Sequence, residues 1–201
     1  KMNMKILIIG ATGTIGKHVT AALQKDHEVI KAGSKNADVQ VHISSIEPIE
    51  NLYKQAGKFD ALICAAGDAQ IGPLASMKEA DFRIGIDSKL MGQVNLVLIG
   101  QHYINPKGSF TLTSGALADD PILMGANIST MNGAINGFVK GAAIELGNGV
   151  RINAVGPDIV EESMAYFPYF PGHVPVTMNR VAQAYVKSVL GGQTGQIYKV
   201  L

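Results

Sequence analysis

The start of this chain places a strand, a glycine-rich turn and a helix in direct succession. Residues 5–9 read Lys-Ile-Leu-Ile-Ile, and Gly10, Gly13 and Gly16 follow before a helical pattern begins. In such a turn the first glycine permits a sharp change of direction, the second lets the main chain approach a pyrophosphate, and the third lets the helix pack against the strand. The free N–H groups at the amino terminus of the helix then face the anion. The sequence therefore predicts a dinucleotide-binding site at this turn.

Strand and helix signals alternate along the rest of the chain, which is typical of a parallel sheet with helices on both faces. Only residues 33–38 separate the second strand from the third, and this segment is too short for a crossover helix. We expect one Rossmann-type α/β domain over residues 1–201, with a doubly wound parallel sheet of about seven strands. The predicted strands cover residues 6–9, 27–32, 39–43, 60–64, 110–113, 150–155 and 195–200, and the predicted helices cover residues 14–25, 46–56, 79–103, 124–146 and 178–190.

Composition and charge exclude several classes of partner. The chain has 201 residues, of which 47% are apolar and 16% charged, a balance typical of one globular domain. The net charge of +1 gives no sign of a nucleic-acid surface, and no apolar stretch is long enough to span a bilayer. The five histidines lack the spacing of metal ligands, so we expect no metal site. The single cysteine, Cys64, is expected in the core, and without a signal peptide we expect a cytoplasmic protein.

Four segments of the chain resemble the short-chain dehydrogenase/reductase family. They are the turn at residues 10–16, Cys64-Ala65-Ala66-Gly67 after the fourth strand, Leu112-Thr-Ser114 at the end of the fifth strand, and residues 132–157 over the family's active-site helix and sixth strand. The resemblance covers nearly the whole chain, and it implies a Rossmann fold and an oxidoreductase that binds a nicotinamide cofactor and a small-molecule substrate. It also implies that Ala65, Ala66, Gly67 and Pro157 lie beside that cofactor.

The resemblance breaks at the family's catalytic residues. The family pairs a proton-donating tyrosine with a lysine one helical turn later, and the match places Ile128 at the tyrosine position and Asn132 at the lysine position. No tyrosine occurs between residues 124 and 140. The family's catalytic asparagine falls at about Lys89, and the serine is kept as Ser114. We therefore expect a non-standard catalytic site in which Lys89 binds the ribose or polarises a substrate oxygen, Ser114 is a second donor, and Asn132 supplies an amide.

Three functions are compatible with such a site. An oxidoreductase would transfer hydride to a small carbonyl, a quinone or another conjugated acceptor, and conjugated acceptors are favoured because water can protonate them after the hydride arrives. A catalytically inactive protein that senses NAD(P) would also keep the glycine turn and lose the catalytic pair. A degenerate scaffold would bind no cofactor, and the intact turn argues against it. Titration with NADPH and NADH, followed by turnover assays, separates the three.

The end of the second strand favours NADP over NAD. An acid at this place would bind the ribose hydroxyls of NAD and repel a phosphate. The chain reads Lys-Ala-Gly-Ser-Lys over residues 31–35 and has no acid before Asp38. Ser34 and Lys35 can donate hydrogen bonds to a 2′-phosphate, so the sequence predicts NADP as the cofactor.

Four further side chains are expected around the cofactor. Thr12 can reach a phosphate through its hydroxyl, and Ile15 lies at the start of the helix beneath that phosphate. The resemblance places His42 and Ile43 along the groove for the adenine, with His42 at the position where the family usually has an aspartate.

Two parts of the chain are expected to serve the substrate and the assembly. Residues 157–177 follow the end of a strand and are rich in proline and aromatic side chains, so we predict a substrate lid, with a plain surface loop as the alternative. The long helices predicted at residues 79–103 and 124–146 carry small residues. The resemblance implies a homodimer or homotetramer that packs through these helices, and the alternative is packing within the subunit.

Overall fold

The computed structural model describes residues 3–201 and contains one parallel sheet in the strand order β3-β2-β1-β4-β5-β6-β7. Consecutive strands of the amino-terminal half run outward on one side of β1, and those of the other half run outward from β4. This reversal of direction defines a doubly wound Rossmann-type sheet, as the sequence predicts. The strands are β1 (Lys5–Ile9), β2 (Glu28–Gly33), β3 (Val39–Gln40), β4 (Phe59–Cys64), β5 (Ile104–Thr113), β6 (Arg151–Pro157) and β7 (Ile197–Val200).

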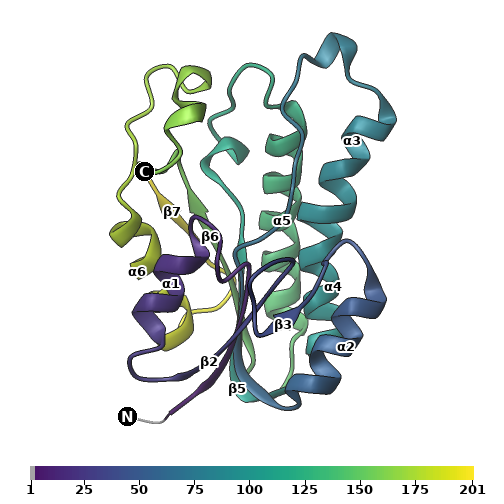
Figure 1. The fold of residues 1–201 in the computed structure, drawn as a ribbon, viewed down its shortest axis with the longest axis vertical. Coiled ribbons are helices and arrows are strands. Elements are labelled where there is room, and N and C mark those ends of the chain that lie inside the picture. The colour runs from purple at the N-terminus through teal and green to yellow at the C-terminus, as the bar shows by residue number, and fades with distance from the viewer. Residues whose placement is uncertain (1–2) are drawn as a thin grey trace.

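Helices cover both faces of the sheet (Figure 1). One face carries α1 (Gly16–Leu23) and α6 (Met178–Leu190), and the other carries α2 (Ile46–Ala56), α4 (Met91–Gly100) and α5 (Ala126–Glu145). Side chains alternate along β1, so that Ile6 and Ile8 join the apolar cluster under α1 and α6, while Leu7 and Ile9 join the cluster on the opposite face. Because both faces are covered, β1 is continuously apolar.

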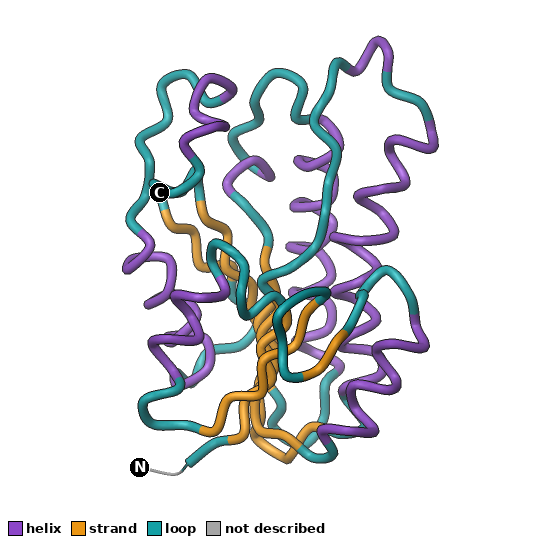
Figure 2. The backbone as a smooth tube through the Cα atoms, in the orientation of Figure 1, coloured by secondary structure: helices purple, strands orange, loops and turns teal. Residues whose placement is uncertain are grey.

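The carboxyl ends of the strands meet at one edge of the sheet, where the connecting loops are long (Figure 2). The loops after β4, β5 and β6 all rise beyond this edge, together with α3 (Glu79–Gly85). The sheet changes winding direction between β1 and β4, and such a switch point leaves a crevice at the carboxyl ends of the strands. We therefore expect the functional site at this edge.

Three predicted elements differ clearly from the observed ones. The helix predicted over residues 79–103 is interrupted, because residues Ile86–Leu90 between α3 and α4 form a wider π-helical turn and α4 ends at Gly100. The strand predicted over residues 110–113 begins at Ile104, since β5 pairs with β4 first through Ile104 and again from Ser109, with an irregularity between them. The Pro106-Lys-Gly segment thus interrupts a strand rather than preceding it. The third strand is shorter than predicted, while the absence of a helix at residues 34–38 is confirmed.

Candidate functional site

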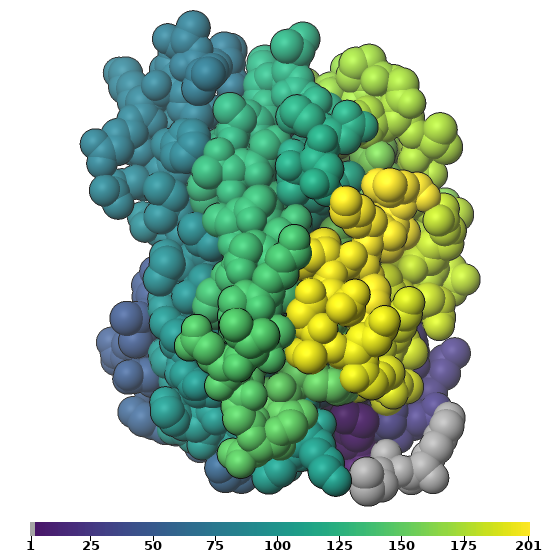
Figure 3. Space-filling model, turned by 180° about the vertical axis from the view of Figure 1, so that it is seen from behind, coloured from purple at the N-terminus to yellow at the C-terminus, as the bar shows by residue number. Residues whose placement is uncertain are grey.

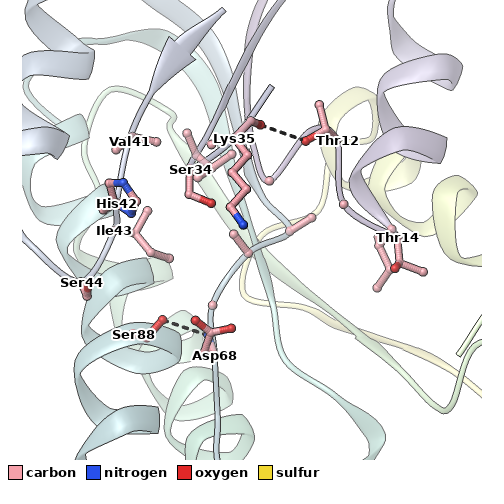
Figure 4. Close-up of a pocket in the computed structure, with 18 residues that line it drawn as sticks. Thr12, Thr14, Ser34, Lys35, Val41, His42, Ile43, Ser44, Asp68 and Ser88 are labelled. Carbon is pink, nitrogen blue, oxygen red and sulfur yellow. Dashed lines mark hydrogen bonds between the residues drawn. The ribbon is translucent and has the colours of Figure 1, made fainter. Parts of the chain in front are cut away.

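A cavity of about 580 Å³ lies at the carboxyl ends of β1, β2 and β4. Figure 4 shows its walls, with the turn after β1 on one side and the segment after β3 on the other. Sequence-predicted residues that line it are Gly10, Thr12, Gly13, Ile15, Ser34, Lys35, His42, Ile43, Ala65, Ala66 and Gly67. Lining residues that the sequence analysis did not single out are Ile9, Thr14, Gly33, Val41, Ser44, Asp68 and Ser88.

The glycine turn has a shape that side chains would prevent. Gly10 has a φ of +77°, and a Cβ on it would stand 2.7 Å from the carbonyl oxygen of Ala65. A Cβ on Gly16 would overlap the carbonyl oxygen of Gly10, so Gly16 lies under the turn and not on the cavity wall. Gly13 is exposed and leaves the main chain bare toward the cavity. Thr12 Oγ1 donates to the carbonyl of Lys35 at 3.3 Å, which ties this turn to the end of β2.

Basic and polar groups follow β2 along the cavity. Ser34 and Lys35 are exposed, and in Figure 4 the Lys35 ammonium points into the cavity. The acidic lining residue, Asp68, follows β4 on another wall, where its N–H donates to Ser88 Oγ at 2.9 Å. The β2 end therefore presents positive charge without a carboxylate among its lining residues.

A second cavity of about 190 Å³ lies beyond the ends of β5 and β6. Ile15 lines both cavities, which makes them neighbours. The predicted residues Lys89, Ser114, Ile128, Asn132 and Pro157 all line the second cavity, so the fold brings together residues that lie far apart in the chain. The other lining residues are Thr113, Gly115, Leu117, Asp158, Ile159, Val160, Ser163 and Phe170.

Lys89 stands on the π-helical turn between α3 and α4. Its Nζ donates to the carbonyl oxygen of Ser114 at 3.5 Å. Burial lowers the pKa of the Lys89 ammonium from 10.5 to about 8, with the nearby Cys64 thiol acting in the opposite direction. Gly67 makes room for this lysine, because a Cβ at position 67 would stand 2.8 Å from the Cα of Lys89. Lys89 is thus a partly desolvated amine at the wall of the cavity.

Ser114 and Asn132 close the cavity on the α5 side. The Ser114 side chain is buried and its Oγ donates to the carbonyl of Asn132 at 3.3 Å. Asn132 is also buried, and its Oδ1 has no hydrogen-bond partner within the described chain. An unpaired buried amide oxygen is costly, and this one belongs to a side chain that lines the second cavity.

One aromatic hydroxyl is hydrogen-bonded to a residue of this wall and has a structural role. Tyr185 on α6 is fully buried, and its hydroxyl lies 2.6 Å from Thr113 Oγ1, which donates to the carbonyl of Cys64. Burial raises the pKa of Tyr185. Tyr185 does not line the cavity. Its hydrogen bond to Thr113, which is bonded in turn to Cys64, connects α6 to the ends of β4 and β5.

Two buried amides that the sequence analysis left out of the site hold it in place. Gln93 donates through Nε2 to the carbonyls of Lys89 at 3.0 Å and Thr113 at 2.8 Å, and its Oε1 accepts from Thr113 N at 2.8 Å. Asn127 accepts from Gln70 N and donates to the Phe82 carbonyl, each at 2.8 Å. A glutamine within a largely apolar helical segment is a signal that the sequence does contain. Such a side chain is expected to be buried and to need hydrogen-bond partners.

The segment predicted as a lid is fastened at both sides of the second cavity. Glu162 pairs with Lys17 Nζ at 2.7 Å and His18 Nε2 at 2.6 Å, both on α1. These contacts lower the pKa of the Glu162 carboxyl, and its hydrogen bond to Lys17 is the largest cause. On the other side, His173 pairs with Asp158 at 2.8 Å. Phe170 lines the cavity, so one aromatic side chain of the segment faces the site.

Two kinds of feature are absent from residues 3–201. No three His, Cys, Asp or Glu side chains in this part of the chain gather as metal ligands would. None of its helices is long and apolar enough to cross a membrane.

A parallel doubly wound sheet with a glycine turn beside a crevice at its switch point defines the dinucleotide-binding class of Rossmann domains. Residues 4–189 match a family model described as enoyl-(acyl carrier protein) reductase. The crystal structure of the protein lin1944 from Listeria innocua has a TM-score of 0.97 and 48% identity, over 98% of this chain and 100% of that one. With a TM-score of 0.89 and 24% identity, a small-chain dehydrogenase crystallised with NADPH shares the fold over 99% of this chain and 97% of its own.

One curated relative is the 3-oxoacyl-acyl-carrier-protein reductase FabG of Rickettsia bellii. It is 26% identical over an alignment of 181 residues, and the alignment covers 79% of this chain and 73% of the relative. With the family model spanning nearly the whole sequence, the chain belongs to the short-chain dehydrogenase/reductase family, whose members are NAD(P)-binding oxidoreductases.

Proposed function

We propose that this protein is an NADP-dependent oxidoreductase that reduces a small carbonyl, a quinone or another conjugated acceptor at a non-standard site. The larger cavity takes the cofactor and the smaller one takes the substrate. The observation that carries the proposal is the Lys89 ammonium at the wall of the smaller cavity, with a pKa lowered to about 8. A cationic acid that releases its proton near neutral pH can take the part that the family gives to a tyrosine.

The residues around the larger cavity fit a dinucleotide. The turn at Gly10 and Gly13 offers bare main chain at the start of α1, where a diphosphate is stabilised by free N–H groups. Ser34 and Lys35 suit a 2′-phosphate, and His42 and Ile43 suit the adenine wall. When bound, the reduced nicotinamide supplies the hydride.

A charge reversal at Lys35 should change the choice of cofactor. We expect Lys35→Glu to weaken binding of NADPH about tenfold or more, as loss of one charge-assisted hydrogen bond implies, and to leave NADH almost unaffected. Isothermal calorimetry with both cofactors measures the two dissociation constants. Lys31→Glu makes the same charge change on β2 at a residue outside the cavity, and serves as the control. Equal losses for both cofactors in Lys35→Glu would refute the assignment to the phosphate.

The protein's own residues would handle the proton and the substrate oxygen. Lys89 donates a hydrogen bond to that oxygen and gives up its proton as the oxygen gains negative charge. Ser114 Oγ, now turned to the Asn132 carbonyl, is a second donor within the same cavity. The free Oδ1 of Asn132 accepts from a ribose or substrate hydroxyl. Ile128, Leu117 and Phe170 keep the cavity apolar and limit the access of water.

Calorimetry and turnover assays test the proposal together. The purified chain is titrated with NADPH and NADH, and oxidation of NADPH is then followed against a set of aldehydes, ketones, naphthoquinones and flavins. Turnover supports the oxidoreductase. Binding without turnover points instead to a protein that senses the cofactor, and the absence of binding points to a scaffold.

We also propose that the chain forms a homodimer or homotetramer through α4 and α5. Figure 3 shows α5 lying along the surface, and a Cβ on Gly133, Gly137 or Gly141 would meet no neighbouring atom within 4 Å. Leu98 and Ile144 are exposed on the same two helices. We expect sedimentation velocity to give an oligomer for the wild type and a smaller species for Gly137→Arg, with unchanged circular dichroism. A monomeric wild type would contradict the proposal.

A further inference from the structure

His173 lies between two carboxylates that belong to different loops. Its Nδ1 is 2.8 Å from Asp158 Oδ2 and 2.9 Å from Oδ1, and its Nε2 is 3.8 Å from Asp120 Oδ2. The loop that carries Asp120 and the segment that carries His173 rise side by side beyond the sheet (Figure 1). An ionised carboxylate only accepts hydrogen bonds, so Nδ1 carries a proton and Nε2 is the nitrogen turned toward Asp120.

Exposure changes steeply along these three residues. The Asp120 side chain is 78% exposed, His173 is 9% exposed and Asp158 is 11% exposed. Asp158 follows β6 directly and lines the same small cavity as Lys89 and Ser114. Its Oδ1 also accepts the N–H of Ile159 at 2.7 Å, which fixes the carboxylate at this place. The three groups therefore run from the solvent to the wall of the proposed substrate cavity.

We propose that Asp120, His173 and Asp158 form a proton path that restores the proton of Lys89 after each reduction. The inference rests on the proposed function, in which Lys89 loses one proton for each simple carbonyl that is reduced. The segment 157–177 forms one wall of this cavity, and it therefore offers a route by which a proton can pass from the solvent to the amine.

The proton balance of one turnover is complete. The acceptor gains one hydride from the cofactor and one proton from Lys89, which is left as a neutral amine. Asp158 takes the Nδ1 proton of His173 and passes it to this amine, directly or through a water in the cavity. His173 takes a proton at Nε2 from the solvent by way of Asp120, which leaves the ring as the Nε2–H tautomer. Before the next turnover the ring rotates out of contact with Asp158, and there Nε2 returns its proton to the solvent and Nδ1 regains one. The net change is one proton drawn from the solvent.

His173 makes more contacts than are needed to hold the lid in place. One N–H of His173 on Asp158 is enough to hold the segment, and Glu162 holds its other side through Lys17 and His18. A fastening leaves the second ring nitrogen without a role, whereas here it faces an exposed carboxylate. Nδ1 is hydrogen-bonded to Asp158, and the 3.8 Å between Nε2 and Asp120 is closed for proton transfer by a small movement of the exposed Asp120 side chain or by one water.

His173→Asn separates conduction from fastening, because an asparagine amide keeps an N–H donor for Asp158 and cannot carry a proton. We expect steady-state reduction of a simple aldehyde or ketone by NADPH to fall about 10- to 100-fold. The first hydride transfer, seen as a stopped-flow burst of NADPH oxidation, should keep its rate. Added imidazole should restore the steady-state rate, and the solvent deuterium isotope effect should rise in the variant. Reduction of a naphthoquinone should change less than twofold, since water protonates its product.

Asp120→Asn is expected to show a milder form of the same defect, and Asp119→Asn is the matched control. Asp119 is the exposed neighbour that pairs with Lys199 at 2.9 Å and does not face the ring. Equal losses on the carbonyl and the quinone without rescue by imidazole would show that His173 only holds the lid, and would overturn the path. So would a wild type that reduces quinones alone, since no proton would then be needed. If none of the acceptors supports oxidation of NADPH by the wild type, the proposed function is wrong, and the proton path is wrong with it.

Discussion

Gly16→Ala should lower the free energy of unfolding by about 3 kcal/mol, at the upper end of what an overpacked position usually costs. The new methyl group would overlap the carbonyl oxygen of Gly10, and its next neighbours are also main-chain atoms, of Gly10 and Ala11. Main chain cannot turn aside as a flexible side chain would. Either α1 moves away from β1 or the turn opens, and both changes remove the bare main chain that the cofactor requires. We therefore expect binding of NADPH to weaken at least about 100-fold.

Urea denaturation and calorimetry measure the two effects, and two further glycines provide the controls. A Cβ on Gly192 would meet no atom within 4 Å, so Gly192→Ala should leave stability and binding within error. A Cβ on Gly13 would stand 3.4 Å from the Gly10 carbonyl oxygen and would otherwise point into open space. Gly13→Ala should therefore fold normally and still lose NADPH, because the methyl group takes the place of the diphosphate. Tight binding of NADPH by either variant would remove the glycine turn from the cofactor site.

The parts of the fold that the sequence predicted well depend on local signals. The apolar run at residues 5–9, the glycines after it and the regular alternation of strands and helices are enough to define a doubly wound sheet, and the observed strand order agrees. The short link between β2 and β3 could also be predicted, because the five residues 34–38 cannot form a crossover helix.

The parts that were missed depend on contacts between distant residues. The π-helical turn at residues 86–90 lies in a segment whose composition suits an ordinary helix, and its wider turn sets where Lys89 stands. The early start of β5 depends on pairing with Phe59 of β4. Within the lid His173 pairs with Asp158, and Glu162 pairs with Lys17 of α1. Both pairs join polar residues that are distant in the chain, and no periodic pattern predicts such contacts.

The candidate site, like the fold, could be predicted only where local segments carry the signal. The resemblance brought Ser114, Asn132 and Ile128 together in advance, since they lie on matching segments, and the structure places all three along one cavity with Lys89. The pKa of Lys89 could not be predicted, because it depends on burial between β4, β5 and α4 rather than on neighbouring residues. Asp158 and His173 are 15 residues apart, and their pairing comes only from the fold.

Lys89→Met should remove reduction of simple carbonyls by about 100-fold or more while leaving the dissociation constant of NADPH within a few-fold. Methionine has a similar length and no proton, so the cavity keeps its shape and loses its acid. Quinone reduction should fall much less, because water can protonate the reduced product. Steady-state kinetics on one aldehyde and one naphthoquinone, with calorimetry on NADPH, distinguish this pattern from a general loss of folding.

The pH dependence gives the same group a second signature. The acid form of Lys89 is needed for reduction, and it is present below the folded-state pKa of about 8. We expect kcat/KM for a carbonyl to be level below this pH and to fall about tenfold per unit above it. The inflection should be missing from the residual activity of Lys89→Met. A wild-type profile that stays level to pH 10 would show that another group gives the proton.

The free energy of unfolding should rise with pH over the range in which the activity falls. Because the pKa of Lys89 is lower in the folded state than its usual 10.5, the unfolded chain binds the extra proton between about pH 8 and 10.5, and this group's contribution to stability rises with pH across that range. At pH 7 both states hold the charge, and the folded state carries the cost of burying it. Lys89→Met should therefore raise the free energy of unfolding at pH 7 by about 2 kcal/mol, with no gain left near pH 10.5. A variant that is less stable at pH 7 would mean that the ammonium is solvated and that its proton is not poised for transfer.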